Sequence, residues 1–386
     1  MTEPPAARLI SLDAFRGFTI AAMVLVNNPG DWDHLYRQLA HASWNGWTFT
    51  DWIFPFFLFI SGVAMVYSLD RRIAAGQRKA ALVRQFVRRA AIIFAIGLAL
   101  NLIPEFNLAT VRIPGVLQRI ALCIAIAAPI VVYHRNWHQQ AAWILALLAA
   151  YTGLMLFVPV PDAQGVVAAG VLEPGRDFGA YVDRMVLGGH LWAKAKTWDP
   201  EGLVSTLPAV CTLLSGALLG RWLHADVAPA DKTVWMMLAG LACLWLGVIL
   251  DVVLMPINKN LWTTSYCVFM NGWALLLFAA FYWLIDGSGS TPLKDRARRL
   301  LQPFTIYGMN ALSLFAFSGL VARLLTMIRF TRAGGTTVTL KSLLVAPLAG
   351  LPIAPVDASL LFAVLFNAAM FALAWWMWSR RWFIKV

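Results

Sequence analysis

The sequence predicts an all-α membrane protein that crosses the bilayer many times, and three observations support this fold class. Hydrophobic residues make up 60% of the 386-residue chain, charged residues make up only 13%, and the mean hydropathy is +0.69. Apolar runs of about 20 residues, the length of helix that crosses a bilayer, recur along the whole chain. Length alone would also fit two soluble domains. Because the runs continue throughout, we expect a single transmembrane domain over residues 1–386.

About ten apolar runs are long enough to form membrane-spanning helices. The sequence before Asp13 lacks the basic region and small-residue cleavage site of a signal peptide, so we expect the first run to remain as a helix. Segment 333–356 contains Gly-Gly and several prolines, which favours a re-entrant or broken helix. The expected spans are residues 9–27, 50–69, 87–103, 114–133, 139–158, 203–223, 233–255, 262–285, 303–328 and 357–379.

The positions of Arg and Lys predict the orientation of these helices. With a cytoplasmic N-terminus, eighteen of the 31 basic residues fall in inner segments and ten in outer segments, as the positive-inside rule requires. Both termini are then cytoplasmic, and loops 28–48 and 159–202 lie outside. We expect loop 159–202 to form short helices that cap the outer mouth of the bundle. The net charge of +12 therefore belongs mainly to membrane loops, so we expect a lipid bilayer and no nucleic acid as partner.

The segment from His41 to Gly62 joins a polar cluster directly to an apolar helix. A neutral imidazole at that boundary can take a proton from an amine or hydroxyl near neutral pH. The alternative is a histidine that only buttresses the loop. Asp51 either caps the helix through its dipole, orients the imidazole or binds a cationic amine. Asn45 is followed by Gly46, which is also typical of a simple tight turn.

Other polar groups are expected around the same outer mouth. Asn27 ends the first helix, where its amide can stabilise an oxyanion or simply stop the helix. Glu201 precedes the sixth helix, and Asn258 and Lys259 precede the eighth. We interpret Trp262, which follows them, as an ordinary interfacial aromatic residue.

Charged side chains within apolar spans are costly to bury and suggest function. Asp13 and Arg16 lie three residues apart on one helical face and are expected to pair. Gln118 and Arg119 lie about one turn into another helix. The four cysteines lie in or beside apolar runs without metal-site spacing, so we interpret them as core residues and expect no metal: Cys123, Cys211, Cys243 and Cys267.

The motifs also carry a family resemblance. Nearly the whole chain, from Arg8 to the last helix, resembles the heparan-alpha-glucosaminide N-acetyltransferase family. The segments that carry it, in the expected order, are LDAFRGFTIAAMVLVNN, HASWNGWTFTDWIFPFFLFISG, VRIPGVLQRIAL, DPEGLVSTLPAV and NKNLWTTSYCVF.

The resemblance implies transfer of acetyl from cytoplasmic acetyl-CoA, as a co-substrate, to an amino sugar or small glycan fragment beyond the membrane. It places the active-site histidine on His41 and a supporting asparagine on Asn27. His41 is then a general base for direct transfer, which we favour, or becomes acetylated itself. We expect a multi-pass protein of a bacterial inner membrane, with a homodimer left open.

Two sets of ligand contacts complete the hypothesis. For the sugar they are Asp51, Asn45, Glu201, Asn258 and Lys259. For CoA they are Asp13, Arg16, Gln118 and Arg119, with a basic inner face to receive the phosphates. The alternative function is an inner-membrane transporter for N-acetylglucosamine or a related amino sugar, because polar groups among about ten helices also suit transport.

Overall fold

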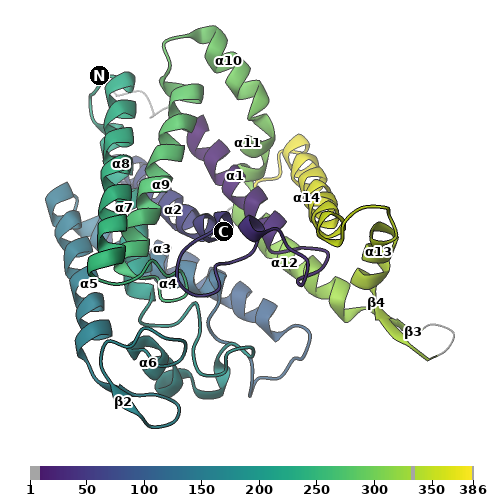
Figure 1. Ribbon diagram of the computed structural model, residues 1–386. Helices are drawn as coiled ribbons and strands as arrows, with labels where there is room; N and C mark the ends of the chain where they lie inside the picture. Colours follow the sequence, from purple (N-terminus) through teal and green to yellow (C-terminus); the bar gives the residue numbers. More distant parts are fainter. Residues whose placement is uncertain (1–8, 332–334, 385–386) are drawn as a thin grey trace.

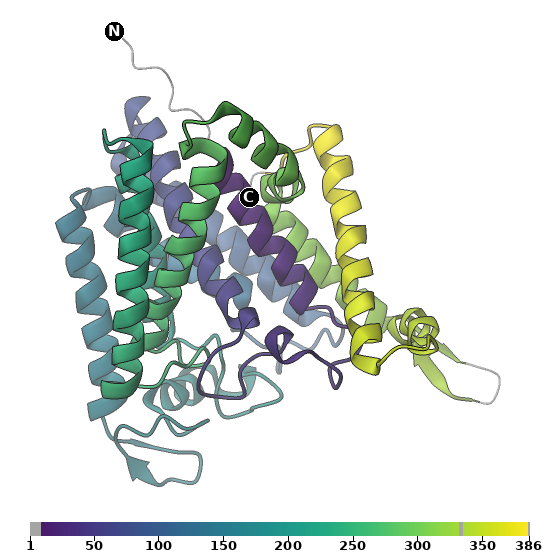
Figure 2. The same ribbon diagram turned by 45° about the horizontal axis from the view of Figure 1, so that its top comes forward.

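The computed structural model describes residues 9–331 and 335–384, which form a bundle of long helices with a layer of loops and short elements at one end (Figures 1 and 2). The α-helices are α1 Ile10–Val26, α2 Phe49–Ala74, α3 Lys79–Leu102, α4 Val116–Tyr133, α5 Trp137–Phe157, α6 Phe178–Leu187, α7 Thr206–His224, α8 Pro229–Val253, α9 Thr264–Tyr282, α10 Thr291–Leu300, α11 Gln302–Met309, α12 Ala311–Met327, α13 Leu340–Ala349 and α14 Pro355–Ser379. Single turns occur at Arg37–Leu39, Gly188–His190 and Trp283–Gly287. Two small antiparallel hairpins pair β1 Val160–Pro161 with β2 Val167–Ala168 and β3 Arg329–Thr331 with β4 Thr337–Thr339.

The prediction of a helical membrane protein is confirmed. Within the described residues, eight helices are long and apolar enough to cross a membrane: α2, α3, α4, α5, α7, α8, α9 and α14. A ninth span is formed only if α11 and α12 are counted together, and α1 has 17 residues. Every one of the ten expected ranges therefore contains a helix, but α1 is at the short limit for crossing a bilayer.

The expected helix at 303–328 is wrong as a continuous span. The chain bends by 81° between α11 and α12. The Asn310 side chain at the bend donates to the Trp382 carbonyl and accepts from the Ile384 amide, which attaches the bend to the C-terminal segment. Segment 333–356 contains the short helix α13, as expected, together with strand β4, which the sequence analysis did not anticipate.

Glycines bring pairs of helices into close contact and thereby build the core. A Cβ at Gly216 of α7 would lie 1.8 Å from the Phe59 carbonyl oxygen of α2, and one at Gly62 would lie 1.9 Å from the Leu213 carbonyl oxygen. A Cβ at Gly308 of α11 would lie 1.9 Å from the Asp13 carbonyl oxygen of α1. Only glycine permits such close backbone approach.

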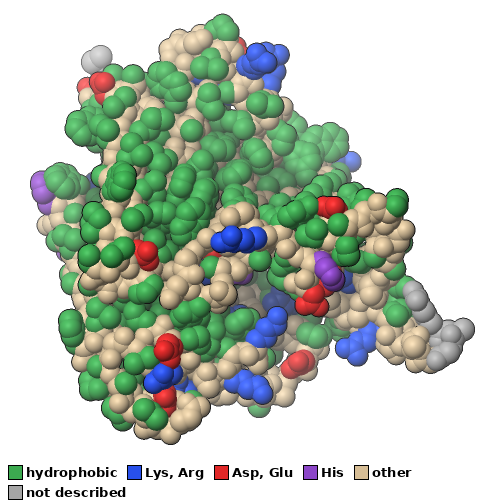
Figure 3. Space-filling model, in the orientation of Figure 1, with side chains coloured by type: hydrophobic (Ala, Val, Ile, Leu, Met, Phe, Trp, Pro, Cys, Tyr) green, Lys and Arg blue, Asp and Glu red, His purple; other side chains and the backbone are tan. Residues whose placement is uncertain are grey.

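The outer helices present apolar surface on the flanks of the bundle. In the most apolar windows of α3, α5 and α8, only 22%, 22% and 17% of residues are buried, respectively. Figure 3 shows hydrophobic side chains over the helical flanks and charged side chains gathered towards the layer of loops. This distribution is typical of a protein whose flanks contact lipid.

The loops 27–48, 103–115, 158–205 and 254–263 lie together at one end of the bundle, which we call the His41 end (Figure 2). The first helix starts at the opposite end, and α14 finishes there. Helix α6 and the β1–β2 hairpin belong to the expected capping loop.

Candidate functional site

His41 and Asp51 form a hydrogen-bonded pair at the His41 end. The distance from His41 Nδ1 to Asp51 Oδ1 is 2.6 Å, the imidazole side chain is 47% exposed and the carboxylate is 1% exposed. With the proton on Nδ1, the ring donates to the carboxylate and Nε2 is left to accept a proton. A buried carboxylate thus fixes the tautomer of a ring that solvent and substrate can reach.

The local sequence explains why Asp51 occupies this position. Thr48 and Asp51 form a capping box at the start of α2, in which Asp51 Oδ2 accepts from the Thr48 amide at 3.0 Å. The same oxygen accepts from the Ala42 amide at 3.1 Å. Asp51 therefore both caps helix α2 and hydrogen-bonds to the His41 imidazole.

The Asn45-Gly46 turn joins the His41 segment to the loop before α9. Gly46 has a φ of +91°, as expected for the tight turn, and its amide donates to the Ile257 carbonyl at 2.7 Å. The Asn45 side-chain oxygen accepts from the Asn258 amide group at 3.0 Å. Residues about 210 positions apart are thus held side by side, as the hypothesis of one outer mouth requires.

A buried ion network lies beside this contact. Arg112 donates to both oxygens of Asp199, at 2.8 and 2.6 Å, and to Glu201 at 2.5 Å. Lys259 Nζ lies 4.0 Å from the other Glu201 oxygen. Burial raises the pKa of the Glu201 carboxyl, but the charges of Arg112 and Lys259 outweigh burial and hold that pKa well below its usual range. Glu201 is therefore ionised at neutral pH. Arg112 was not among the candidate site residues, although it is the first residue of the RIPGV segment that carries the resemblance.

Trp262 is not an interfacial residue, contrary to expectation. Its side chain is fully buried, its φ is +52°, and its indole Nε1 donates to Thr212 at 3.2 Å. The guanidinium of Arg119 lies 5.3 Å from its ring centroid. These buried contacts explain why the indole is withdrawn from the surface.

Arg119 links the start of α4 to the start of α7. Its guanidinium donates to the Gly202 carbonyl at 2.9 Å and to the Ser205 hydroxyl, and it is 1% exposed. The Gln118 side chain is also buried, against Gly97 and Gly115. Both residues therefore lie near the His41 end of the bundle.

Asp13 and Arg16 lie elsewhere, in the half of α1 nearer the opposite end. They form the expected ion pair at 2.6 Å, and Arg16 Nε donates to the Gly308 carbonyl of α11 at 2.8 Å. The four residues predicted to contact CoA thus form two pairs at different depths in the bundle.

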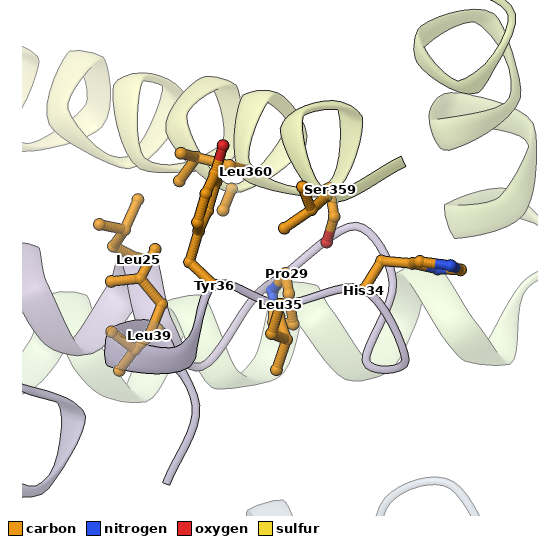
Figure 4. Close-up of a pocket in the computed structure, with 11 residues that line it drawn as sticks. Leu25, Pro29, His34, Leu35, Tyr36, Leu39, Ser359 and Leu360 are labelled. Carbon is orange, nitrogen blue, oxygen red and sulfur yellow. The ribbon is translucent and has the colours of Figure 1, made fainter. Parts of the chain in front are cut away.

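The loop that carries His41, residues 27–48, is attached to α14. The Gly30 amide donates to the Ser359 carbonyl at 3.1 Å, the Asp31 amide donates to the Ser359 hydroxyl at 3.0 Å, and Tyr36 donates to Asp357. Figure 4 shows Tyr36 beside Leu360 and the Ser359 hydroxyl pointing towards the loop, around a small, largely apolar pocket. Asn27 is the exposed C-cap of α1, and no hydrogen bond joins its side chain to His41 among the described residues.

Residues 8–184 match a family model described as "Heparan-alpha-glucosaminide N-acetyltransferase, catalytic". The chain is 29% identical over 342 residues to the Homo sapiens heparan-alpha-glucosaminide N-acetyltransferase and 29% identical over 338 residues to the Mus musculus protein of the same name. Each alignment covers 74% of this chain and 50% of the relative, so the chain spans about half the length of these curated relatives.

The chain is similar to the heparan-alpha-glucosaminide N-acetyltransferases, through the family model over residues 8–184 and through both relatives at 29% identity. The region that matches the family model includes His41, Asp51 and Asn27. Glu201, Asn258 and Lys259 lie beyond it, and in the structure they are contributed to the same end of the bundle by later loops. The resemblance seen in the sequence is confirmed.

A second histidine–aspartate pair lies in the same loop as His41. His34 Nδ1 lies 2.6 Å from Asp31 Oδ2, with side chains 50% and 45% exposed. Sequence analysis did not consider His34. Because Asp31 is exposed whereas Asp51 is buried, the two histidines differ mainly in the environment of their carboxylate partners.

Within the part of the chain that the structure describes, no group of three or more His, Cys, Asp or Glu side chains could hold a metal ion. The described thiols are free, with Cys123, Cys211 and Cys267 buried and Cys243 partly buried. They are therefore core residues, as expected.

Proposed function

We propose that the chain is a transmembrane N-acetyltransferase that transfers acetyl from acetyl-CoA to the amine of a glucosamine-type sugar. The observation that carries this proposal is the His41–Asp51 pair, in which a buried carboxylate holds a half-exposed imidazole. The similarity to heparan-alpha-glucosaminide N-acetyltransferases supports acetyl transfer as the reaction.

The proposed reaction is a direct transfer at His41. The sugar amine attacks the thioester carbonyl carbon, a C–N bond forms, the C–S bond breaks, and His41 Nε2 takes a proton from the amine and returns it to the leaving thiolate. Asp51 stabilises the imidazolium that forms between these steps. The exposed Asn27 amide is the proposed donor to the oxyanion.

The acceptor is proposed to bind among the polar groups beside His41. Asn45 and Asn258 supply amide groups, Glu201 supplies an ionised carboxylate and Lys259 supplies a cation. Hydroxyl groups of a sugar can both donate to and accept from such a set.

The donor is proposed to enter from the opposite, basic end of the bundle. Arginines of α2, α3 and α10 lie there, including Arg72, Arg89 and Arg298. Guanidinium groups recognise phosphates, and the charged cofactor cannot cross a bilayer. By positive-inside asymmetry this end is cytoplasmic, and the membrane is proposed to be a bacterial inner membrane.

Replacing His41 tests the proposal. In proteoliposomes supplied with acetyl-CoA labelled in the acetyl group and with glucosamine, His41→Ala should lower acetyl transfer by about 10²- to 10⁴-fold, because proton transfer is lost. His34→Ala is the matched control, since it removes a second Asp-paired histidine of the same loop, and it should retain transfer. Full activity of His41→Ala would refute the assignment, as would uptake of N-acetylglucosamine without acetyl transfer.

A second measurement distinguishes the two chemical routes. Incubation with labelled acetyl-CoA alone, followed by peptide mass spectrometry, should leave His41 unmodified if transfer is direct. An acetyl group on His41 that passes to added sugar at the turnover rate would replace the direct route with a covalent one.

A further inference from the structure

The second turn of α2 contains a proline, Pro55, four residues after Asp51. In an α-helix the amide of residue i+4 donates to the carbonyl of residue i, so the Asp51 carbonyl should accept from residue 55. Pro55 has no amide proton, and its ring pushes against the carbonyl four residues earlier. The helix therefore cannot supply its usual donor to the main chain of the residue that orients His41.

A tyrosine from another helix supplies the missing donor. The Tyr266 hydroxyl in the first turn of α9 donates to the Asp51 carbonyl at 2.6 Å, and its side chain is fully buried. The Tyr266 ring is held by Trp262, whose centroid lies 5.3 Å away at an interplanar angle of 83°. The contact joins residues 215 positions apart, of which Asp51 lies inside the region matched by the family model and Tyr266 lies beyond it.

The Asp51 main chain and side chain thus have different tasks. The Asp51 carboxylate hydrogen-bonds to His41 and to the Thr48 amide of the helix cap, whereas the Asp51 main-chain carbonyl accepts from the Tyr266 hydroxyl of α9. Without Tyr266 the buried Asp51 carbonyl would have no hydrogen-bond donor, which is costly. The first turn of α2 would then be free to tilt and relieve that cost. A tilt moves the carboxylate, and a displacement of about 1 Å is enough to weaken an aligned catalytic pair.

We propose that Tyr266 is a positioning residue for the His41–Asp51 pair and that it is required because Pro55 removes the helical donor. This inference rests on the proposed function only for its catalytic consequence. The hydrogen bond of Tyr266 is to the main-chain carbonyl of Asp51 and not to its carboxylate, so in this proposal Tyr266 acts through the backbone of α2.

The test is a double-mutant cycle. Tyr266→Phe in the wild-type background should lower kcat/KM for acetyl transfer by about tenfold, the size of one lost buried hydrogen bond. In the Pro55→Ala background the helix regains its own donor, so Tyr266→Phe should lower kcat/KM by less than about twofold. Equal losses in both backgrounds would overturn the inference.

A matched control separates positioning from general loss of a buried hydroxyl. Tyr307→Phe removes a buried hydroxyl bonded to Asn367 between α11 and α14, and it should not show the dependence on Pro55. Melting temperatures of all variants in detergent identify any variant whose activity loss reflects unfolding.

A second readout does not depend on acetyl transfer. The rate at which diethyl pyrocarbonate modifies His41, measured by peptide mass spectrometry relative to His34 in the same sample, should change in Tyr266→Phe and return towards the wild-type ratio when Pro55→Ala is added. If wild-type protein shows no acetyl transfer, the proposed function fails, but this ratio still tests Tyr266. If transfer occurs and the ratio is unchanged by Tyr266→Phe, the positioning role fails and the proposed function stands.

Discussion

Asp183 is a buried carboxylate that connects the capping loop to the start of α7. Its Oδ1 accepts from the Leu203 amide at 2.8 Å, and the residue is 2% exposed. Burial raises the pKa of the Asp183 carboxyl to about 7, and the nearby Asp199 charge acts in the same direction. Because the folded pKa lies above that of an unfolded aspartate, the folded state binds the proton more tightly between about pH 4 and pH 7, and stability falls as pH rises through this range.

Asp183→Asn should therefore stabilise the protein at alkaline pH. The amide oxygen keeps the acceptor for Leu203, and the cost of burying a charge is removed, which we expect to be worth about 2 kcal/mol at pH 8. The melting temperature in detergent, followed by circular dichroism, should exceed that of wild type at pH 8 and match it near pH 4. The exposed Asp33→Asn is the control. A stabilisation of equal size at both pH values would contradict the burial argument.

The residues of the site differ in how far the sequence alone could reveal them. Thr48 and Asp51 have the spacing of a capping box, and Gly46 follows Asn45, so both local conformations could be predicted. Arg112 and Tyr266 could not, because each acquires its role from partners 87 and 215 positions away. Trp262 was assigned to the wrong environment for the same reason: its hydropathy fits an interface equally well, and only the tertiary contacts bury it.

At the scale of elements, the contact between α2 and α7 depends on Gly216. An added methyl group there would meet the main chain of Phe59, which cannot move away as a flexible side chain would. Gly216→Ala should therefore destabilise the bundle by about 3 kcal/mol. Gly153→Ala in α5 is the matched control, because nothing lies within 4 Å of the added Cβ.

Thermal melts and the yield of folded protein in detergent measure the difference between the two variants. We expect a clearly lower melting temperature for Gly216→Ala and a melting temperature near wild type for Gly153→Ala. Similar values for the two would mean that the α2–α7 contact tolerates separation of the helices.

The positions of the long helices were predictable because apolar length is a local property of the sequence. The bend after Met309 was not, because its cause is the contact of Asn310 with residues 382 and 384. No proline marks that point, and Asn310 is one of several polar residues in the run from 303 to 328, so the local sequence does not single it out. The partners of Asn310 are more than 70 positions away in the sequence, so the contact leaves no local signal.

At the scale of the whole molecule, the two ends of the bundle should face different compartments. Asp33→Cys places a thiol in the exposed part of the His41 loop, and Asp295→Cys places one on exposed α10 at the opposite end. In right-side-out vesicles a membrane-impermeant maleimide should label Asp33→Cys and spare Asp295→Cys, because basic segments are retained in the cytoplasm.

Inside-out vesicles should give the reverse pattern, and the native thiols contribute little because three of the four are buried. Labelling of Asp295→Cys from the outside would reverse the proposed orientation.

The sequence could predict which loops share an end, because spans alternate in direction, but it could not predict that Asn45 touches Asn258 or that Glu201 touches Arg112.

The attachment of the His41 loop to Ser359 has a consequence for the entropy of the reaction. Residues 27–48 would be a long flexible loop if they were held only at the ends of α1 and α2, but Ser359 fixes Asp31, and the Thr48 hydroxyl donates to the Ala40 carbonyl at 2.6 Å. His41 therefore moves only within the short segment between Ala40 and Thr48. In the proposed reaction, a mobile histidine would lose conformational entropy at each turnover, and part of that entropy is already lost in the folded chain. Ser359 of α14, 328 positions from Asp31 in the sequence, helps to maintain this order.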